Sequence, residues 1–384
     1  MSLESNQMPA ITKKIIERSN NHFGHDIAVI GGGIVGSTTA LELATLGYQV
    51  ELFDPNFSKT INYSQNLSGS HASLGVLMGY VFKRNTGRSW LLRKRSMELW
   101  PHLISKLKES DNNLKIFSPL IQLARSEDEL KTMSKLIKER KNSGLELLSP
   151  HSSNQKDPAW PSNNFGGLVS NNDGRINPLK VMSSLMKELE KYGVKKTNKK
   201  VSAIKRIKTN HGKRWQLNLD NEGHLNKKTI VICSAATSEE LIKPLGYDYP
   251  IQPVLGQAIK VQLSDKKNNW SEWPAVLTIT GMNLIPQDNN HLIIGATLEA
   301  GELANEACLK NLLEINGLAP YWLKDTFITN SWKGIRFKPT KEPAPLLKDL
   351  EPGLILNTAH YRNGFLLAPA CAEWVGQRLH KDNE

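Results

Sequence analysis

The sequence contains little cysteine, and its spacing suggests no cysteine chemistry. The 384 residues include only Cys233, Cys308 and Cys371, an odd number of cysteines that lie far apart. This arrangement fits neither a disulfide framework nor a CxxC metal or redox motif. We therefore expect three reduced cysteines with structural roles, and we predict no metal site.

Long apolar runs are also missing. No uncharged apolar run reaches the roughly 18 residues that a membrane-spanning helix needs. The opening stretch, MSLESNQMPAITKKIIERSNNHFGH, divides its apolar residues into pairs and lacks the continuous apolar region of a signal peptide. We expect a cytoplasmic protein with no transmembrane segment and a polar tail over residues 1–24. The remaining length allows a large core and two interlocked domains.

Patterns typical of nucleic-acid-binding folds are absent, although the formal net charge is +12. The densest basic stretch, residues 187–228, still has acidic residues among its lysines. We interpret it as an ordinary charged surface. A nucleic-acid partner remains the less favoured alternative.

The strongest motif is HDIAVIGGGIVGSTTALELATLGYQVELFDPN, which reads as strand, glycine turn, helix and second strand. Gly31 permits a tight turn, Gly33 lets the backbone approach a pyrophosphate, and Gly36 allows the helix to pack closely on the strand. Asp54 ends the second strand, where its carboxylate can accept both ribose hydroxyls and repel a 2′-phosphate. The motif predicts FAD or NAD, and not NADP. No second fingerprint follows, so we expect one bound dinucleotide.

The middle of the chain predicts one further helix and many short strands. Asn177 is the expected N-cap, Pro178 the first helical residue and Gly193 the stop. The expected buried stripe of this helix is Leu179, Met182, Leu185, Met186 and Leu189. Strands are expected at 201–207, 214–219, 229–235 and 353–359, and a terminal helix at 368–381. Short alternating segments between 247 and 335 indicate an antiparallel sheet.

Together the motifs resemble those of the D-amino acid oxidase superfamily of FAD-dependent oxidoreductases, and most closely those of its glycine oxidase branch. They occur in family order from about residue 25 to the end: VIGGGIVG, SGSHASLGVLM, DGRINP, PVLGQ, LIPQDNNHLIIGAT, GIRFKP and HYRNGFLLAPA. The resemblance implies an α/β fold, with a Rossmann-like FAD-binding domain on a parallel sheet and a substrate domain on an antiparallel sheet. The expected FAD-binding domain covers 25–100, 165–246 and 336–384, and the substrate domain covers 101–164 and 247–335.

The resemblance also implies which residues contact FAD. Ile34 and Val35 would lie at the first turn, and Val201 at the adenine end. Residues 360–366 would lie along the isoalloxazine and lead into a helix whose N-terminus favours the negative charge of reduced flavin. A backbone close to a planar ring leaves no room for a Cβ, which fits Gly364. The full set of expected contacts is Gly31, Gly33, Ile34, Val35, Gly36, Asp54, Pro55, Gly69, Ser70, Leu74, Gly75, Val76, Val201, His360, Tyr361, Arg362, Asn363, Gly364, Phe365 and Leu366.

Two arginines match the positions at which glycine oxidase-like enzymes hold a substrate carboxylate, Arg336 in GIRFKP and Arg362 in HYRNG. A guanidinium grips a carboxylate with two parallel hydrogen bonds. The implied reaction is oxidative deamination or demethylation of a small amino acid or secondary amine, with hydride transfer from Cα to flavin N5. Oxygen or an electron carrier would then accept the electrons. A homo-oligomer is compatible with this interpretation.

Several positions depart from the family pattern. Asn283 replaces a tyrosine, Leu255 replaces an arginine, and Ala236 lies where the family has a glycine. We expect Asn283 and Leu298 to suit a bulkier or N-alkylated amino acid. Two alternatives therefore remain beside the amine oxidase or dehydrogenase. One is a flavin enzyme that oxidises an aminomethyl-carboxylate on tRNA, and the other is a non-catalytic flavin-holding subunit.

Overall fold

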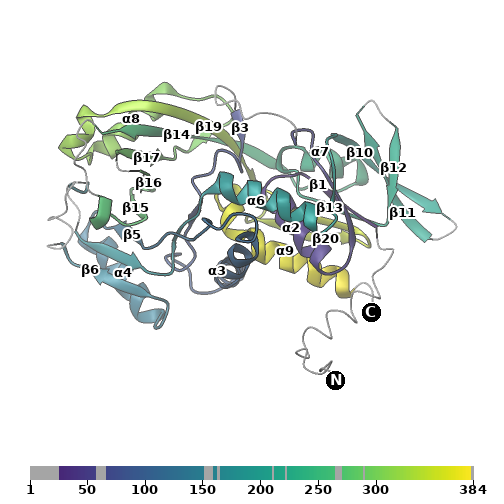
Figure 1. The fold of residues 1–384 in the computed structure, drawn as a ribbon, viewed down its shortest axis with the longest axis horizontal. Coiled ribbons are helices and arrows are strands. Elements are labelled where there is room, and N and C mark those ends of the chain that lie inside the picture. The colour runs from purple at the N-terminus through teal and green to yellow at the C-terminus, as the bar shows by residue number, and fades with distance from the viewer. Residues whose placement is uncertain are drawn as a thin grey trace, which may run out of the picture.

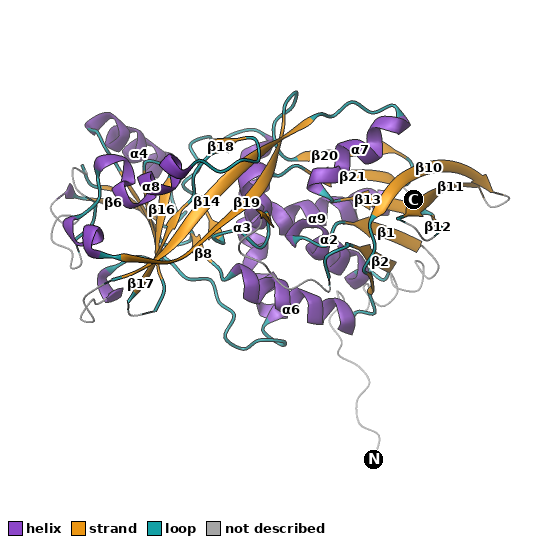
Figure 2. Cartoon of the chain, turned by 90° about the horizontal axis from the view of Figure 1, so that it is seen from above, coloured by secondary structure: helices purple, strands orange, loops and turns teal. Residues whose placement is uncertain are grey.

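The computed structural model describes residues 26–57, 66–150, 159–161, 165–209, 212–220, 223–263, 270–288 and 290–381. Two large sheets lie side by side along the length of the molecule (Figures 1 and 2). The predicted tail, residues 1–24, lies outside the described residues.

The first sheet has six strands in the order β20-β21-β13-β1-β2-β9, and all neighbours are parallel except β20 and β21. Its strands are β1 (Asp26–Ile30), β2 (Gln49–Phe53), β9 (Lys195–Thr197), β13 (Thr229–Ile232), β20 (Leu346–Glu351) and β21 (Leu354–Thr358). Successive side chains enter different cores, because Ile27 and Val29 pack in one cluster while Ala28 and Ile30 pack in another. Burial on both faces explains why β1 is apolar from Ile27 to Ile30.

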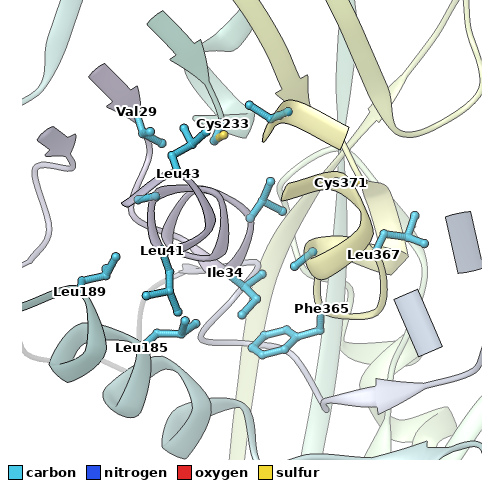
Figure 3. Close-up of a cluster of buried hydrophobic side chains, with 14 of the residues drawn as sticks. Val29, Ile34, Leu41, Leu43, Leu185, Leu189, Cys233, Phe365, Leu367 and Cys371 are labelled. Atoms are coloured by element: carbon cyan, nitrogen blue, oxygen red, sulfur yellow. The ribbon is translucent and has the colours of Figure 1, made fainter. Parts of the chain in front are cut away.

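Helices α2 (Ile34–Thr45) and α9 (Gly364–Lys381) pack on one face of this sheet, and α3 (Arg88–Leu107) and α6 (Pro178–Lys191) pack against these two helices. Helix α2 is buried between α6 and α9, with Leu41 facing Leu185 and Leu189 (Figure 3). The terminal helix begins at Gly364, earlier than the predicted residue 368. The apolar residues that directly follow Gly364 belong to the helix, which buries them.

Helix α6 confirms the predicted caps. The Asn177 side chain accepts a hydrogen bond from the Lys180 N–H, and Pro178 opens the helix. The predicted buried stripe was wrong at Leu179, which is 39% exposed, while Val181 is fully buried. Leu179 lies in the first turn and outside the apolar cluster, whereas Val181 belongs to that cluster and provides the apolar contact at this end.

The second sheet has ten strands in the order β3-β19-β14-β17-β16-β15-β5-β7-β6, with β18 paired to β14. Its pairs are antiparallel except β19 with β3 and β15 with β5. The strands are β3 (Asn66–Ser68), β5 (Leu120–Leu123), β6 (Leu145–Leu148), β7 (Gly167–Ser170), β14 (Ile251–Gln262), β15 (Val276–Ile279), β16 (Met282–Pro286), β17 (His291–Gly295), β18 (Glu299–Ala300) and β19 (Phe327–Pro339). The two sheets confirm the predicted α/β class.

Smaller elements complete the chain. They are β4 (Val76–Leu77), β8 (Gly174–Arg175), β10 (Val201–Thr209), β11 (Gly212–Leu219), β12 (His224–Lys227), α4 (Glu127–Glu139), α7 (Ser238–Ile242) and α8 (Glu306–Glu314). Strands β3 and β7 pair into the ten-stranded sheet, although the predicted limits assign both to the FAD-binding domain. The domain limits themselves remain a prediction.

Candidate functional site

A cavity of about 1850 Å³ is lined by both sheets, by the loop around residues 68–76 and by helix α4. Its lining includes both proposed carboxylate-binding residues, Arg336 and Arg362. Most predicted flavin contacts also line it: Gly31, Gly33, Ile34, Val35, Asp54, Pro55, Gly69, Ser70, Leu74, Val76, Val201, His360, Tyr361, Asn363, Gly364, Phe365 and Leu366. Gly36 and Gly75 lie outside the lining and act through backbone packing. A Cβ at Gly36 would lie 1.8 Å from the Gly31 carbonyl oxygen, and Gly75 has φ +71°.

The glycine turn presents the start of α2 to this cavity. Gly31 has φ +105°, a value that L side chains rarely adopt, and α2 has neither an N-cap side-chain bond nor an acidic residue in its first turn. The Asp54 carboxylate accepts hydrogen bonds from Gly32 N at 2.7 Å and from Asn56 N at 2.8 Å. A positive helix end beside a held carboxylate fits the pyrophosphate and ribose of a dinucleotide.

The loop before α9 forms another part of the cavity wall. Ala359 and Tyr361 have positive φ values of 51° and 55°, so this backbone is strained where it lines the cavity. His360 is 6% exposed, and its Nε2 has no hydrogen-bond partner among the described residues. Burial, aided by the charge of Arg88, lowers the pKa of His360 to about 3, so the ring is neutral near pH 7. A neutral buried ring with an unpaired nitrogen fits a polar cofactor edge against this loop.

Arg336 is preorganised by the sheet. Its Nη1 donates to the Thr297 carbonyl at 3.2 Å and to the Leu255 carbonyl at 3.5 Å. The guanidinium lies over Gly256, where a Cβ would come within 2.1 Å of Nη1. Burial, together with the positive charge of Arg362, lowers the pKa of Arg336 to about 10, so Arg336 remains charged near pH 7.

Arg362 is exposed and lines the same cavity. Across the described ranges, no salt bridge joins Arg336 or Arg362 to an acidic side chain. Their charges thus remain available to an anionic ligand, because no protein carboxylate neutralises either one directly.

Arg93, on α3, is a third guanidinium at the cavity, and the sequence did not reveal it. It donates to Asn363 Oδ1 at 3.0 Å and to the Met78 carbonyl at 2.9 Å, and it stacks 4.2 Å from the centroid of the Phe82 ring. Arg93 therefore anchors the loop that carries Arg362. Its surroundings, LLRKRSMELW, read as a charged helix face and give no sign of this contact.

A buried carboxylate supports Arg336 from behind and was likewise not predicted. Glu299 is 7% exposed and accepts hydrogen bonds from Gln257 Nε2 at 3.0 Å, from Asn305 N at 2.7 Å and from the Thr297 hydroxyl. Thr297 and Gln257 also bond through their backbones at 3.0 Å. The network fixes the segment whose Thr297 carbonyl holds Arg336. Gln257 belongs to the PVLGQ motif, which was the only sequence signal for it.

The two residues expected to enlarge the pocket differ in position. Asn283 lines the cavity, and its Oδ1 is buried without a hydrogen-bond partner among the described residues. Leu298 is 51% exposed and lies outside the lining. The expectation for Leu298 was therefore wrong, because its side chain points to solvent.

Two other kinds of feature were searched for in the described parts of the chain. There, no group of three or more His, Cys, Asp or Glu side chains is placed to hold a metal ion. None of the helices in those parts combines the length and apolar character needed to cross a bilayer.

Comparison with known proteins gives consistent matches over nearly the whole chain. Residues 26–378 match the DAO family, described as FAD dependent oxidoreductase. The glycine oxidase of Geobacillus kaustophilus is 23% identical, covering 90% of each chain. The bifunctional protein ThiO/ThiG of a Nostoc species is 26% identical over 92% of this chain, which spans 52% of that protein's length. The crystal structure of the Geobacillus kaustophilus enzyme superposes with a TM-score of 0.79 at 22% identity, covering 93% of this chain and 95% of that one.

Proposed function

Because this chain belongs to the DAO family of FAD dependent oxidoreductases, we propose that it oxidises the carbon–nitrogen bond of a small amino acid or secondary amine. Family membership confirms the predicted FAD cofactor and the resemblance to the glycine oxidase branch. The amine class is supported by the glycine oxidases among the relatives. The observation that carries the proposal is that Arg336 and Arg362 line the same cavity as the glycine fingerprint, without an acidic partner among the described residues.

Bound FAD supplies the hydride acceptor in this reaction. The chain's own residues position the substrate. Arg336, held by the Thr297 carbonyl, and Arg362, on the loop that Arg93 anchors, bind the carboxylate from two elements. This double attachment limits the orientations of the Cα–H bond, so catalysis rests on proximity and orientation. His360 stays neutral and adds no further positive charge to this wall.

The two alternative functions have less support. In the basic stretch 187–228, several described cations are paired with acidic side chains, which supports a charged surface over a phosphate-binding track. These cations are Lys191, Lys195, Lys196, Arg206 and Lys227. A non-catalytic flavin-holding role does not account for a preorganised Arg336 that lacks an acidic partner among the described residues.

The test is anaerobic reduction of the purified holoenzyme. We expect glycine, sarcosine, D-alanine or D-proline to bleach the flavin band, and we expect Arg362→Ala to slow bleaching by about a hundredfold or more, because it removes a charged bidentate contact. A flavin that dithionite reduces but no amino acid reduces would reject the proposal.

A further inference from the structure

A row of uncharged polar side chains crosses the ten-stranded sheet inside the cavity. Thr278 on β15 is the direct partner of Gln122 on β5 and of Asn283 on β16. Directly paired residues project their side chains from the same face of a sheet. All three residues line the cavity that holds the proposed carboxylate site. Gln122, Thr278 and Asn283 together are called the polar row.

The polar row and Arg336 share one face of this sheet. Asn283 pairs with Gly295, Gly295 with Ala258, and Ala258 with Trp332 on β19. Arg336 follows Trp332 by an even number of positions, so it projects from the same face. Strands are about 4.8 Å apart, and β16 lies three strands from β19, which places Asn283 about 14 Å from the strand on which Arg336 lies.

The polar row has no hydrogen-bond partner in the described parts of the chain. Thr278 is 4% exposed, and Asn283 Oδ1 is buried and accepts no hydrogen bond from a described residue. Within the described ranges, no hydrogen bond reaches the side chain of Gln122, Thr278 or Asn283. Buried polar groups are rarely left unpaired, because each unsatisfied group costs about 1–3 kcal/mol. Asn283 Oδ1 is such a group, and it lies in line with the buried Thr278 and the half-buried Gln122 on the cavity wall, which indicates a surface that binds a polar ligand.

We propose that the polar row binds an uncharged hydrogen-bonding substituent of the substrate, and that the substrate is an amino acid extended by a carboxamide rather than glycine itself. This inference rests on the proposed function, because Arg336 and Arg362 supply the fixed end of the ligand. A carboxamide carries both donors and an acceptor, as Gln122 and Asn283 do, so it is the best complement to the row.

The charges around the polar row favour a neutral substituent. The neighbouring ions on the α4 side of the cavity are paired with each other: Arg125 with Glu129 at 2.8 Å, and Lys135 with Glu139 at 3.8 Å. The row itself has no charge. A second carboxylate would leave its water shell for a wall that offers no net positive charge, which is unfavourable. An aliphatic substituent would leave Asn283 Oδ1 unpaired and would offer Gln122 and Thr278 no hydrogen bond.

The experiment compares matched amino acids on the holoenzyme. Both enantiomers of asparagine and glutamine are tested against leucine and norleucine, which have similar size without hydrogen bonds, and against aspartate and glutamate. Rates come from anaerobic flavin reduction. Dissociation constants come from calorimetry on the dithionite-reduced holoenzyme, which cannot oxidise them. We expect the carboxamide amino acid to reduce the flavin at least about tenfold faster than its apolar and acidic matches, and to bind at least about tenfold more tightly.

Variants assign the preference to the row. Thr278→Val keeps the shape and removes one hydroxyl, and Asn283→Leu removes an amide. Each should lower the carboxamide preference by about tenfold and leave glycine binding within about twofold, whereas Asn330→Leu, on the exposed part of β19, should change neither. If Asn283→Leu does not fold, Thr278→Val decides alone.

Four outcomes overturn the inference. A preference for leucine over asparagine would show that water satisfies the hydrogen bonds of the polar row. A preference for aspartate over asparagine would show that the positive charge of the arginines sets the selectivity. A preference that survives Thr278→Val would place recognition elsewhere. Reduction by glycine alone rejects this inference and leaves the proposed function standing, while no reduction by any amino acid rejects the proposed function.

Discussion

Arg336 donates through Nη1 to the carbonyl oxygen of Thr297 over 3.2 Å. The hydroxyl of the same threonine donates to Glu299, whose carboxylate also accepts from Gln257 and Asn305. Glu299 thus positions Arg336 through Thr297 without touching it. The proposed binding of the substrate carboxylate by Arg336 therefore depends on a buried acid, Glu299, that does not line the cavity.

Replacing that acid should loosen the grip. Glu299→Gln places an amide N–H₂ among groups that are all donors, so we expect the free energy of unfolding to fall by about 1–3 kcal/mol. KM for the amine should rise while kcat changes little, because Arg336 loses orientation and not its charge. Chemical denaturation and steady-state kinetics measure the two effects. Glu306→Gln, an exposed change in the first turn of α8, is the control; equal KM values in all three proteins would disprove the positioning role.

Two glycines should respond differently to alanine. At Gly36 a Cβ would lie 1.8 Å from the Gly31 carbonyl, so Gly36→Ala should destabilise the apoprotein itself. A Cβ added at Gly364 would have Ile34 Cγ2, at 3.8 Å, as its nearest described contact. Because φ at Gly364 is −54°, alanine also fits the backbone. We expect Gly364→Ala to preserve the thermal midpoint of the apoprotein and to weaken FAD binding about tenfold or more, since a ring against this backbone leaves no space for a Cβ. Unchanged FAD affinity, measured by fluorescence titration, would place the ring elsewhere.

His360 should make the apoprotein sensitive to acid. Its folded pKa, about 3, is below the unfolded value near 6.5, so between these values the unfolded state binds a proton that the native state does not. Stability contributed in this way is lost as the pH falls from about 6.5 towards 3. At pH 5 the loss is about 2 kcal/mol relative to pH 7.5. His360→Gln should remove that part of the loss. Urea denaturation at pH 5 and pH 7.5 measures the free energy of unfolding of both proteins, and an equal loss in wild type and variant would contradict the prediction.

The sequence predicted the parts of the site that use local motifs. Gly31, Gly33 and Asp54 lie within one strand–turn–helix–strand unit, so spacing alone placed them together. Arg336 and Arg362 came from a resemblance, and both line the cavity that the glycine fingerprint also lines. Arg93, Glu299 and the two partners of Asn283 in the polar row escaped notice because their roles depend on strand register and on contacts between distant segments. For example, Gln122 and Thr278 become neighbours only through the β5–β15 pairing. Composition carries no signal of that pairing.

The central claim is that Arg336 and Arg362 hold a carboxylate during oxidation, and carboxylate dependence of flavin reduction tests it most directly. Each amino acid that reduces the wild-type flavin should be compared anaerobically with its decarboxylated amine, in wild type and in Arg362→Ala. The account predicts that wild type favours the acid by about a hundredfold or more and that Arg362→Ala removes most of this preference. Equal rates for acid and amine in wild type, or a preference that Arg362→Ala leaves intact, would contradict it.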